Sequence, residues 1–280
     1  MKKYLSIAAL LAAGAAFANA ASVTYGEEGT ENTVSAGELN IYMLSGENPY
    51  KSVKISSTED DDSAVNVSIG TWGVEGTVDG MSVNSSSSHD VNITLRNGTL
   101  SGEIDTSGST GVVNIDLQMG YTPTENGGVS YTTRIAAGTS FVLSSKTTLE
   151  FNDMSSGTGV LVWNLSADDV ADQNVLISGK GTVKFSENVT IVLNFESEAA
   201  LNAVVENNAS FQLFGENVSA TGLSNASWTV QVAGEDTGRT LSVNKDGVAT
   251  VVPEPSAFGL LAGLGALALV ASRRRRTKRA

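Results

Sequence analysis

The side chains best suited to nucleophilic chemistry lie together in one short segment. The only histidine of the chain, His89, follows four serines, Ser85–Ser88, and precedes Asp90. Serine, histidine and aspartate form the triad of many hydrolases, but a triad is defined by spatial roles that adjacency in the chain does not provide. No Gly-x-Ser-x-Gly elbow occurs. We therefore interpret the segment as an exposed polar loop and predict no catalytic residue.

Metal chemistry has few candidate ligands in this sequence. One histidine and no cysteine cannot furnish a site built on those residue types. The carboxylates Glu59–Asp62 are oxygen donors of the kind that calcium prefers, but they lack the spacing of a calcium-binding loop. The pair of carboxylates used in glycoside hydrolysis is defined by its separation, which the sequence does not give. We interpret the acidic run as a solvated loop and predict no metal and no cofactor.

The segments that would position any site are short and alternate between apolar and polar residues. Val, Ile, Thr and aromatic residues favour strands with one buried face, and Gly, Asn and Asp between them favour tight turns. Residues 241–243 and 248–252 are predicted to form a hairpin, and 166–174 and 196–205 each a helical insertion or a long corner. The strands are predicted at 91–95, 112–117, 140–143, 147–151, 160–165, 174–177, 182–185, 189–195, 210–214 and 228–232.

This pattern predicts an all-β fold. We favour an elongated right-handed parallel β-helix, a solenoid of stacked coils, with a β-sandwich as the alternative. No strict repeat period is present, so the coils are not expected to be regular. The segment GTVKFSENVTIVLNF at 181–195 resembles the passenger domains of autotransporter-like adhesins.

Two residue types have alternative roles in such a body. The tryptophans Trp72, Trp163 and Trp228 are predicted to pack in the core, with carbohydrate stacking as the alternative for Trp72. Asn-x-Ser/Thr triplets are frequent, and we predict a structural role for them at β corners instead of glycosylation. Their asparagines are Asn66, Asn84, Asn92, Asn97, Asn164, Asn188, Asn208, Asn217 and Asn225.

Charge and cysteine content exclude several classes of protein. Between residues 21 and 255 there are nine basic and 30 acidic residues, a formal charge of −21. Nucleic-acid binding requires a basic face, so this excess of acid argues against it. The chain has no cysteine and therefore no disulfide framework, so its stability must come from packing and backbone pairing.

The N-terminal residues have the pattern of a secretory signal. Lys2 and Lys3 precede an apolar run at 4–17, which ends in a small-x-small sequence. We predict that signal peptidase cleaves after this sequence and that the mature chain begins at Ala21, with an uncleaved anchor as the alternative. The small residues at the cleavage site are Ala18 and Ala20.

Three parts follow one another at the C-terminus: a Pro-Glu-Pro triplet, an uncharged stretch and a basic cluster. The stretch 257–271 is predicted to be a short transmembrane helix, and the cations after it favour a cytoplasmic C-terminus. The residues of the triplet and the first cations are Pro253, Glu254, Pro255, Arg273, Arg274, Arg275 and Arg276.

This tail resembles the PEP-CTERM sorting signal of Gram-negative bacteria. The resemblance implies that a membrane-embedded exosortase recognises the tail and cleaves it near Pro253–Pro255, and that the protein is associated with exopolysaccharide. The same tail is sometimes named after the C-terminal domains of ice-binding proteins, but the body lacks the Thr-x-Thr series of an ice-binding face.

Together these features predict four regions and an exported protein. They are a signal peptide at 1–20, a loop-rich β region at 21–90, a β-rich body at 91–252 and the sorting tail at 253–280, with its basic cluster at 273–279. We expect the chain to pass transiently through the inner membrane and to reach the cell surface or extracellular space. There we expect a structural or adhesive, non-enzymatic role, with exopolysaccharide or cell-surface glycans as partners. The alternative is a polysaccharide-active hydrolase or lyase on a β-helix scaffold.

Overall fold

The body of the chain is built almost entirely from β-strands. The computed structural model describes residues 23–25, 30–35, 37–41, 52–58, 64–70, 75–119, 133–153, 159–171, 174–206 and 210–252. These residues form 21 strands, one α-helix and one short 3-10 helix. The all-β prediction is confirmed.

The first sheet contains eight parallel strands, one from each successive coil of the chain. Within it, matching residues of successive coils lie opposite one another, as Val65, Val91 and Val113 do. In spatial order the strands are β1 (Val23–Tyr25), β3 (Gly37–Ile41), β5 (Val65–Ile69), β7 (Val91–Leu95), β9 (Val113–Gln118), β12 (Thr147–Asn152), β15 (Thr182–Phe185) and β18 (Ser219–Thr221).

The second sheet contains thirteen strands and closes partly on itself. Because β8 pairs with both β10 and β11, ten of these strands form a closed ring. In spatial order the strands are β10 (Thr133–Ile135), β13 (Val160–Leu165), β16 (Val189–Phe195), β19 (Ala226–Val232), β20 (Glu235–Val243), β21 (Val248–Val252), β17 (Ser210–Phe214), β14 (Val175–Gly179), β11 (Ser140–Leu143), β8 (Gly98–Asp105), β6 (Gly76–Ser85), β4 (Ser52–Ser57) and β2 (Glu31–Val34).

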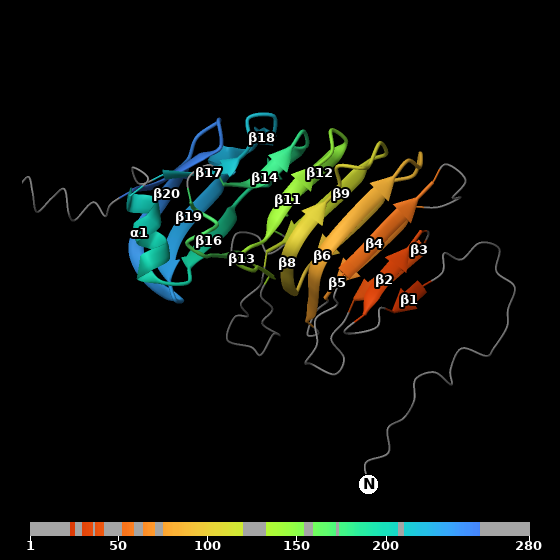
Figure 1. Cartoon of the computed structure of the whole chain (residues 1–280), viewed down its shortest axis with the longest axis horizontal. Coiled ribbons are helices and arrows are strands. Elements are labelled where there is room, and N and C mark those ends of the chain that lie inside the picture. The colour runs from red at the N-terminus through yellow and green to blue at the C-terminus, as the bar shows by residue number, and fades with distance from the viewer. Residues whose placement is uncertain are drawn as a thin grey trace, which may run out of the picture.

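The strand β8 joins two different coil geometries. Its first residues, Gly98–Leu100, pair with β10, and its last, Glu103–Asp105, pair with β11. Between them Gly102 has φ 68°, a conformation that glycine adopts without a Cβ penalty and that lets the strand change direction. Before this point each strand pairs with the strand two places later in the chain, as β6 does with β8. After it, parallel strands pair with the strand three places later, as β11 does with β14. Successive coils therefore stack along the long axis, from red to blue in Figure 1.

The C-terminal end of the body is formed differently. Here β20 and β21 pair antiparallel, and β21 also pairs antiparallel with β17. The helix α1 (Glu198–Glu206) lies at the same end, beside β19 and β20 in Figure 1. The predicted hairpin and the helical insertion near 196–205 are confirmed. Within the segment 166–174, the described residues 167–171 form turns and a bend, which agrees with the predicted corner.

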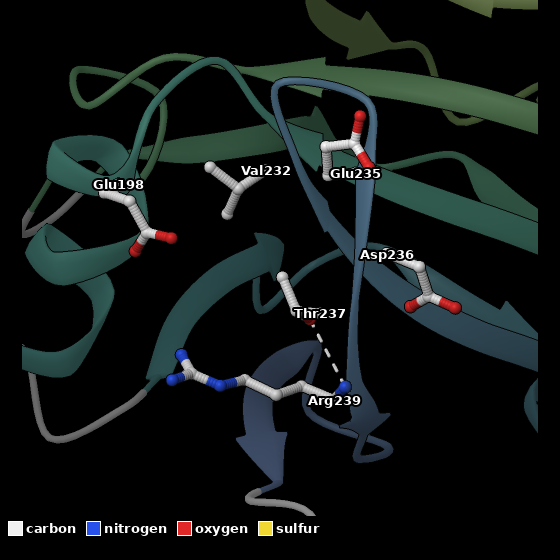
Figure 2. Close-up of a pocket in the computed structure, with 6 residues that line it drawn as sticks. All are labelled: Glu198, Val232, Glu235, Asp236, Thr237 and Arg239. Atoms are coloured by element: carbon white, nitrogen blue, oxygen red, sulfur yellow. Dashed lines mark hydrogen bonds between the residues drawn. The ribbon is translucent and has the colours of Figure 1, made fainter.

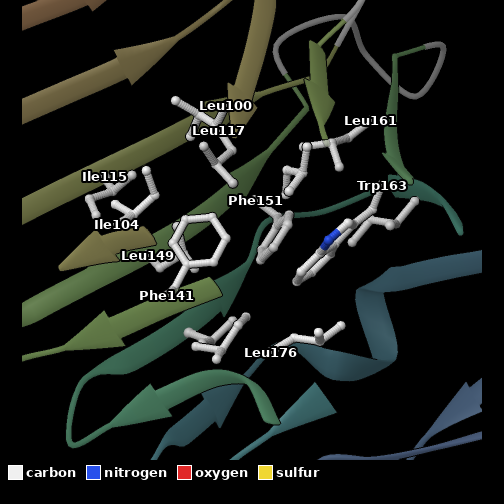
Figure 3. Close-up of a cluster of buried hydrophobic side chains, with 14 of the residues drawn as sticks. Leu100, Ile104, Ile115, Leu117, Phe141, Leu149, Phe151, Leu161, Trp163 and Leu176 are labelled. Carbon is white, nitrogen blue, oxygen red and sulfur yellow. The ribbon is translucent and has the colours of Figure 1, made fainter. Parts of the chain in front are cut away.

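The core is a continuous row of apolar side chains between the sheets. At its centre the ring of Phe151 lies 5.0 Å from that of Phe185 and 6.3 Å from that of Trp163, measured between ring centroids. Figure 3 shows Phe151 between Phe141 and Trp163. These rings are fully or almost fully buried, so aromatic stacking continues through the coils.

Neither predicted architecture describes the whole body. Its coils stack in parallel as a β-helix requires, but the closed ring and the antiparallel pairing of the last strands depart from a regular one. The strands before Val91 are more numerous than the sequence indicated, and both sheets run across residue 90. The division at that residue stays a prediction.

Within the described residues, no helix is long and apolar enough to cross a membrane. The predicted signal peptide at 1–20 and the predicted transmembrane helix at 257–271 lie outside the described part of the chain.

Candidate functional site

The outward side of the first sheet carries two aligned rows of polar side chains, which we call the ladder face. Neighbours within a row lie on adjacent strands, about 4.8 Å apart, and the rows are roughly 7 Å from each other. One row is Asn66, Asn92, Asn114, Thr148, Thr182 and Ser219, and the other is Ser68, Thr94, Asp116, Glu150, Lys184 and Thr221.

Strand alternation produces the ladder face. In β7, Val91, Ile93 and Leu95 are buried, while Asn92 and Thr94 between them are only partly covered. The neighbouring strands repeat this pattern in register, so apolar residues face the core and polar residues align outside.

Asparagine amides link successive coils within the first row. Asn92 Nδ2 donates to Asn66 Oδ1 at 3.1 Å, and Asn114 Nδ2 donates to Asn92 Oδ1 at 3.0 Å. An amide has two N–H donors and an oxygen that accepts two hydrogen bonds. Each of these amides therefore keeps hydrogen-bonding capacity for a ligand beyond the ladder itself.

A charged cluster interrupts the second row at its centre. Arg96 Nε donates to Gln118 Oε1 at 2.7 Å, and Gln118 Nε2 donates to Asp116 Oδ2 at 2.7 Å. Across the next two strands, β12 and β15, Lys184 Nζ lies 2.8 Å from Glu150 Oε1. Because Asp116 and Glu150 are register partners, two carboxylates lie side by side on the face.

The two carboxyl groups have opposite pKa shifts. Burial raises the pKa of Asp116 above its usual range, and the negative charge of Glu150 adds to this, while the hydrogen bond from Gln118 opposes it. Burial also acts on Glu150, but hydrogen bonds from Lys184 and Ser186 outweigh it and hold the pKa of that carboxyl below its usual range. Asp116 Oδ1 is buried, and among the described residues it has no hydrogen-bond partner.

A pocket of about 450 Å³ lies at the C-terminal end of the body, between α1 and the β19–β20 turn (Figure 2). Thr237 Oγ1 accepts a hydrogen bond from the Arg239 backbone N–H at 3.2 Å and donates to the Val230 carbonyl at 2.7 Å. The Arg239 guanidinium forms no ion pair with any described residue. The pocket is lined by Glu198, Val232, Glu235, Asp236, Thr237 and Arg239.

Acidic side chains do not converge into a metal site in the described ranges. No group of three or more His, Asp or Glu residues there has the arrangement needed to hold an ion. The acidic run Glu59–Asp62 lies outside the described part of the chain.

No triad forms around His89 among the residues that the structure describes. This residue is exposed, and its backbone N–H donates to Ser87 Oγ at 3.0 Å. The prediction of a wholly exposed serine loop is wrong, because Ser85 and Ser87 are 0% and 3% exposed. Ser85 is the last residue of β6, so strand alternation continues into the segment and turns every second serine inward.

The tryptophan and asparagine predictions have different outcomes. Core packing is confirmed for Trp163 and Trp228, and Trp72 lies outside the described residues. The corner role fits turn positions such as Asn188, which has φ 61°. It is wrong for Asn66, Asn84, Asn92 and Asn164, which lie within strands.

The ladder face was not among the sites predicted from the sequence. Its signal was present in the triplets that begin at Asn66 and Asn92, where an amide and a hydroxyl two residues apart point to the same side of a strand.

Comparison with known proteins gives information on the C-terminus. Residues 251–276 match the family model of the PEP-CTERM protein-sorting motif. No curated protein and no solved structure matches the chain. The chain thus carries a sorting tail that indicates export to the cell surface and processing by an exosortase. Most of this tail, including Pro253–Pro255 and Arg273–Arg276, and the signal residues Ala18 and Ala20 lie outside the described residues.

Proposed function

We propose that this PEP-CTERM protein has a structural or adhesive role at the cell surface or in the surrounding matrix, where its ladder face binds a neutral polysaccharide. The sorting tail supports the location. The body then acts as an extended binding surface that is delivered to the polymer.

The observation that carries the proposal is the repetition of hydrogen-bonding groups on the ladder face. Polysaccharides present repeated hydroxyl groups that both donate and accept hydrogen bonds. Amide and hydroxyl side chains also do both, and the first row repeats them on adjacent strands. A repeating polymer can therefore contact several coils at once, so that weak single contacts combine.

The negative charge of the body argues against an anionic polysaccharide as the ligand. The nine basic and 30 acidic residues between positions 21 and 255 give a strongly negative body, which disfavours an anionic polymer by like-charge repulsion. Glu150 already pairs with Lys184, so this lysine is not free to offset the repulsion. We therefore propose a neutral glycan.

A second candidate function rests on Asp116 and Glu150. Neighbouring carboxyl groups with opposite pKa shifts are typical of glycosidase acid–base pairs. Here, however, Asp116 Oδ1 is buried and its Oδ2 accepts from Gln118, while Glu150 is held by Lys184. These contacts favour binding over hydrolysis. Release of reducing sugar by the wild type, lost in Glu150→Gln, would favour the hydrolase instead.

The binding proposal is tested with two matched double variants. Asn92→Ala/Asn114→Ala removes a hydrogen-bonded asparagine pair from the ladder face. Asn164→Ala/Asn194→Ala removes an asparagine pair from the second sheet, where Asn194 Nδ2 donates to Asn164 Oδ1 at 2.7 Å. This control also removes two hydrogen bonds to the backbone, from Gly234 N–H to Asn194 Oδ1 and from Asn164 Nδ2 to the Ile135 carbonyl.

Full-length protein in detergent is sedimented with neutral polysaccharide from the producing cells. We expect the ladder variant to bind about tenfold more weakly or worse, and the control variant to bind as the wild type does. Equal binding by the two variants would contradict the proposal.

A further inference from the structure

The sorting motif begins inside the folded body. The motif covers residues 251–276, and β21 extends through Val252. Val251 and Val252 therefore belong to both the motif and the last strand. Pro253 follows directly, so the chain has no linker between the folded sheet and the Pro-Glu-Pro triplet.

The fold engages these two valines. Val251 lies opposite Leu241 and Val252 opposite Thr240 in the antiparallel pairing of β20 with β21. Val251 is only 6% exposed, whereas Val252 is 38% exposed. The strand therefore turns one valine of the motif into the core and leaves the other partly accessible.

The Pro-Glu-Pro triplet offers few main-chain donors, so an enzyme that binds it in extended form needs donors from the residues before it. Proline has no backbone N–H, so of the three residues Pro253–Pro255 only Glu254 offers a main-chain donor. Proteins commonly hold an extended peptide by main-chain hydrogen bonds. The nearest further donors on the N-terminal side belong to Val252 and Val251, whose register partners lie on β20. Hydrogen-bonded and non-hydrogen-bonded pairs alternate along an antiparallel ladder, so only one of these two N–H groups points toward β20.

We propose that Val251 and Val252 are specificity-determining residues for the sorting enzyme, which binds them in extended form after they separate from β20. Local opening of terminal strand residues is a general feature of folded proteins. Processing of the tail is then coupled to opening at the end of β21, and the rest of the strand stays paired with β17 and β20.

The test uses engineered disulfides, because the chain has no cysteine of its own. Thr240→Cys/Val252→Cys links the residues that must separate. Opposite residues of an antiparallel pair have Cα atoms about 4.5–5.5 Å apart, within the range that a disulfide bridges. The matched control, Ser242→Cys/Thr250→Cys, links the same strands two residues farther from the tail.

Full-length variants are expressed in the producing cells, and tail removal is followed by mass spectrometry with and without reductant. We expect the 240/252 disulfide to slow processing at least tenfold and reductant to restore it, while the 242/250 disulfide leaves the rate near that of the wild type. Wild-type processing of the oxidised 240/252 variant would overturn the proposal.

An insertion variant separates the proposed opening from any folding defect of the cysteine variants. The four residues Gly-Ser-Gly-Ser, inserted between Val252 and Pro253, would place new main-chain donors before the triplet. Val251 and Val252 could then stay in the sheet. We expect this insertion to abolish the effect of the 240/252 disulfide. The contrary result is that the variant with both the insertion and the 240/252 cysteines is still not processed when oxidised but is processed when reduced. The disulfide would then prevent some step other than opening at Val252, and the proposal would fail.

Discussion

Truncation of Phe151 tests whether the aromatic row supports the ladder face. Phe151 is fully buried beneath Glu150 and Asn152, with its ring stacked on Phe185 at an interplanar angle of 10°. Phe151→Ala removes this ring from a site whose backbone is fixed by parallel pairing on both sides, with β9 and β15.

The expected loss of stability follows from this confinement. Truncation of a buried phenylalanine to alanine costs about 3–5 kcal/mol, and the cost is greatest where the surroundings cannot collapse into the cavity. Paired strands on both sides oppose collapse, so we expect about 4–5 kcal/mol for Phe151→Ala. Phe151→Leu fills most of the volume without the ring, and we expect about 1–2 kcal/mol.

Urea unfolding of the full-length variants, followed by tryptophan fluorescence, measures both values. The comparison requires the dependence on urea to have the same slope in all three proteins. A loss below about 1 kcal/mol for Phe151→Ala would refute the reasoning, because the row could then relax around a missing ring.

Three further predictions concern titration, a surface ion pair and sorting. The pKa of Asp116 is raised in the fold, so ionisation of this carboxyl group lowers the free energy of unfolding as pH rises from the ordinary carboxyl range through the folded-state pKa. Asp116→Asn should therefore be more stable than the wild type at neutral pH and equally stable in acid. Urea unfolding at a series of pH values will measure this difference. Lys184→Ala should raise the pKa of Glu150, measured by carboxyl NMR titration, yet change stability by less than about 1 kcal/mol because the lysine side chain is 51% exposed. Replacing Arg273–Arg276 by serine should impair tail processing and surface display, and unchanged display, measured by surface labelling, would count against the assigned role of these cations.

Local patterns predicted much of the body. The alternation in segments such as 160–165 predicted β13 with its correct bounds, and Trp163 lies in the core as expected. Such predictions succeed because one buried face and one exposed face dictate the residue types within a single strand.

The alignment of coils could not be predicted in this way. Hydrogen-bonded partners on the ladder face are 26 residues apart from Asn66 to Asn92, 22 from Asn92 to Asn114 and 34 from Glu150 to Lys184. Because the coils differ in length, the residues of one row do not recur at a constant spacing in the sequence, so a search for a constant period does not find them. The change occurs at β8, where Gly102 redirects the strand, and a single glycine does not signal a new coil geometry.

The central claim is that the ladder face binds a neutral polysaccharide, and side-chain amide NMR tests it most directly. Processed protein released from the cell surface is titrated with the polysaccharide, and the amide signals of its asparagines are followed. We expect the signals of Asn66, Asn92 and Asn114 to shift together with the polymer concentration, and those of Asn164 and Asn194 to stay in place. Shifts confined to the second pair, or no shift at polymer concentrations that saturate sedimentation, would contradict the claim.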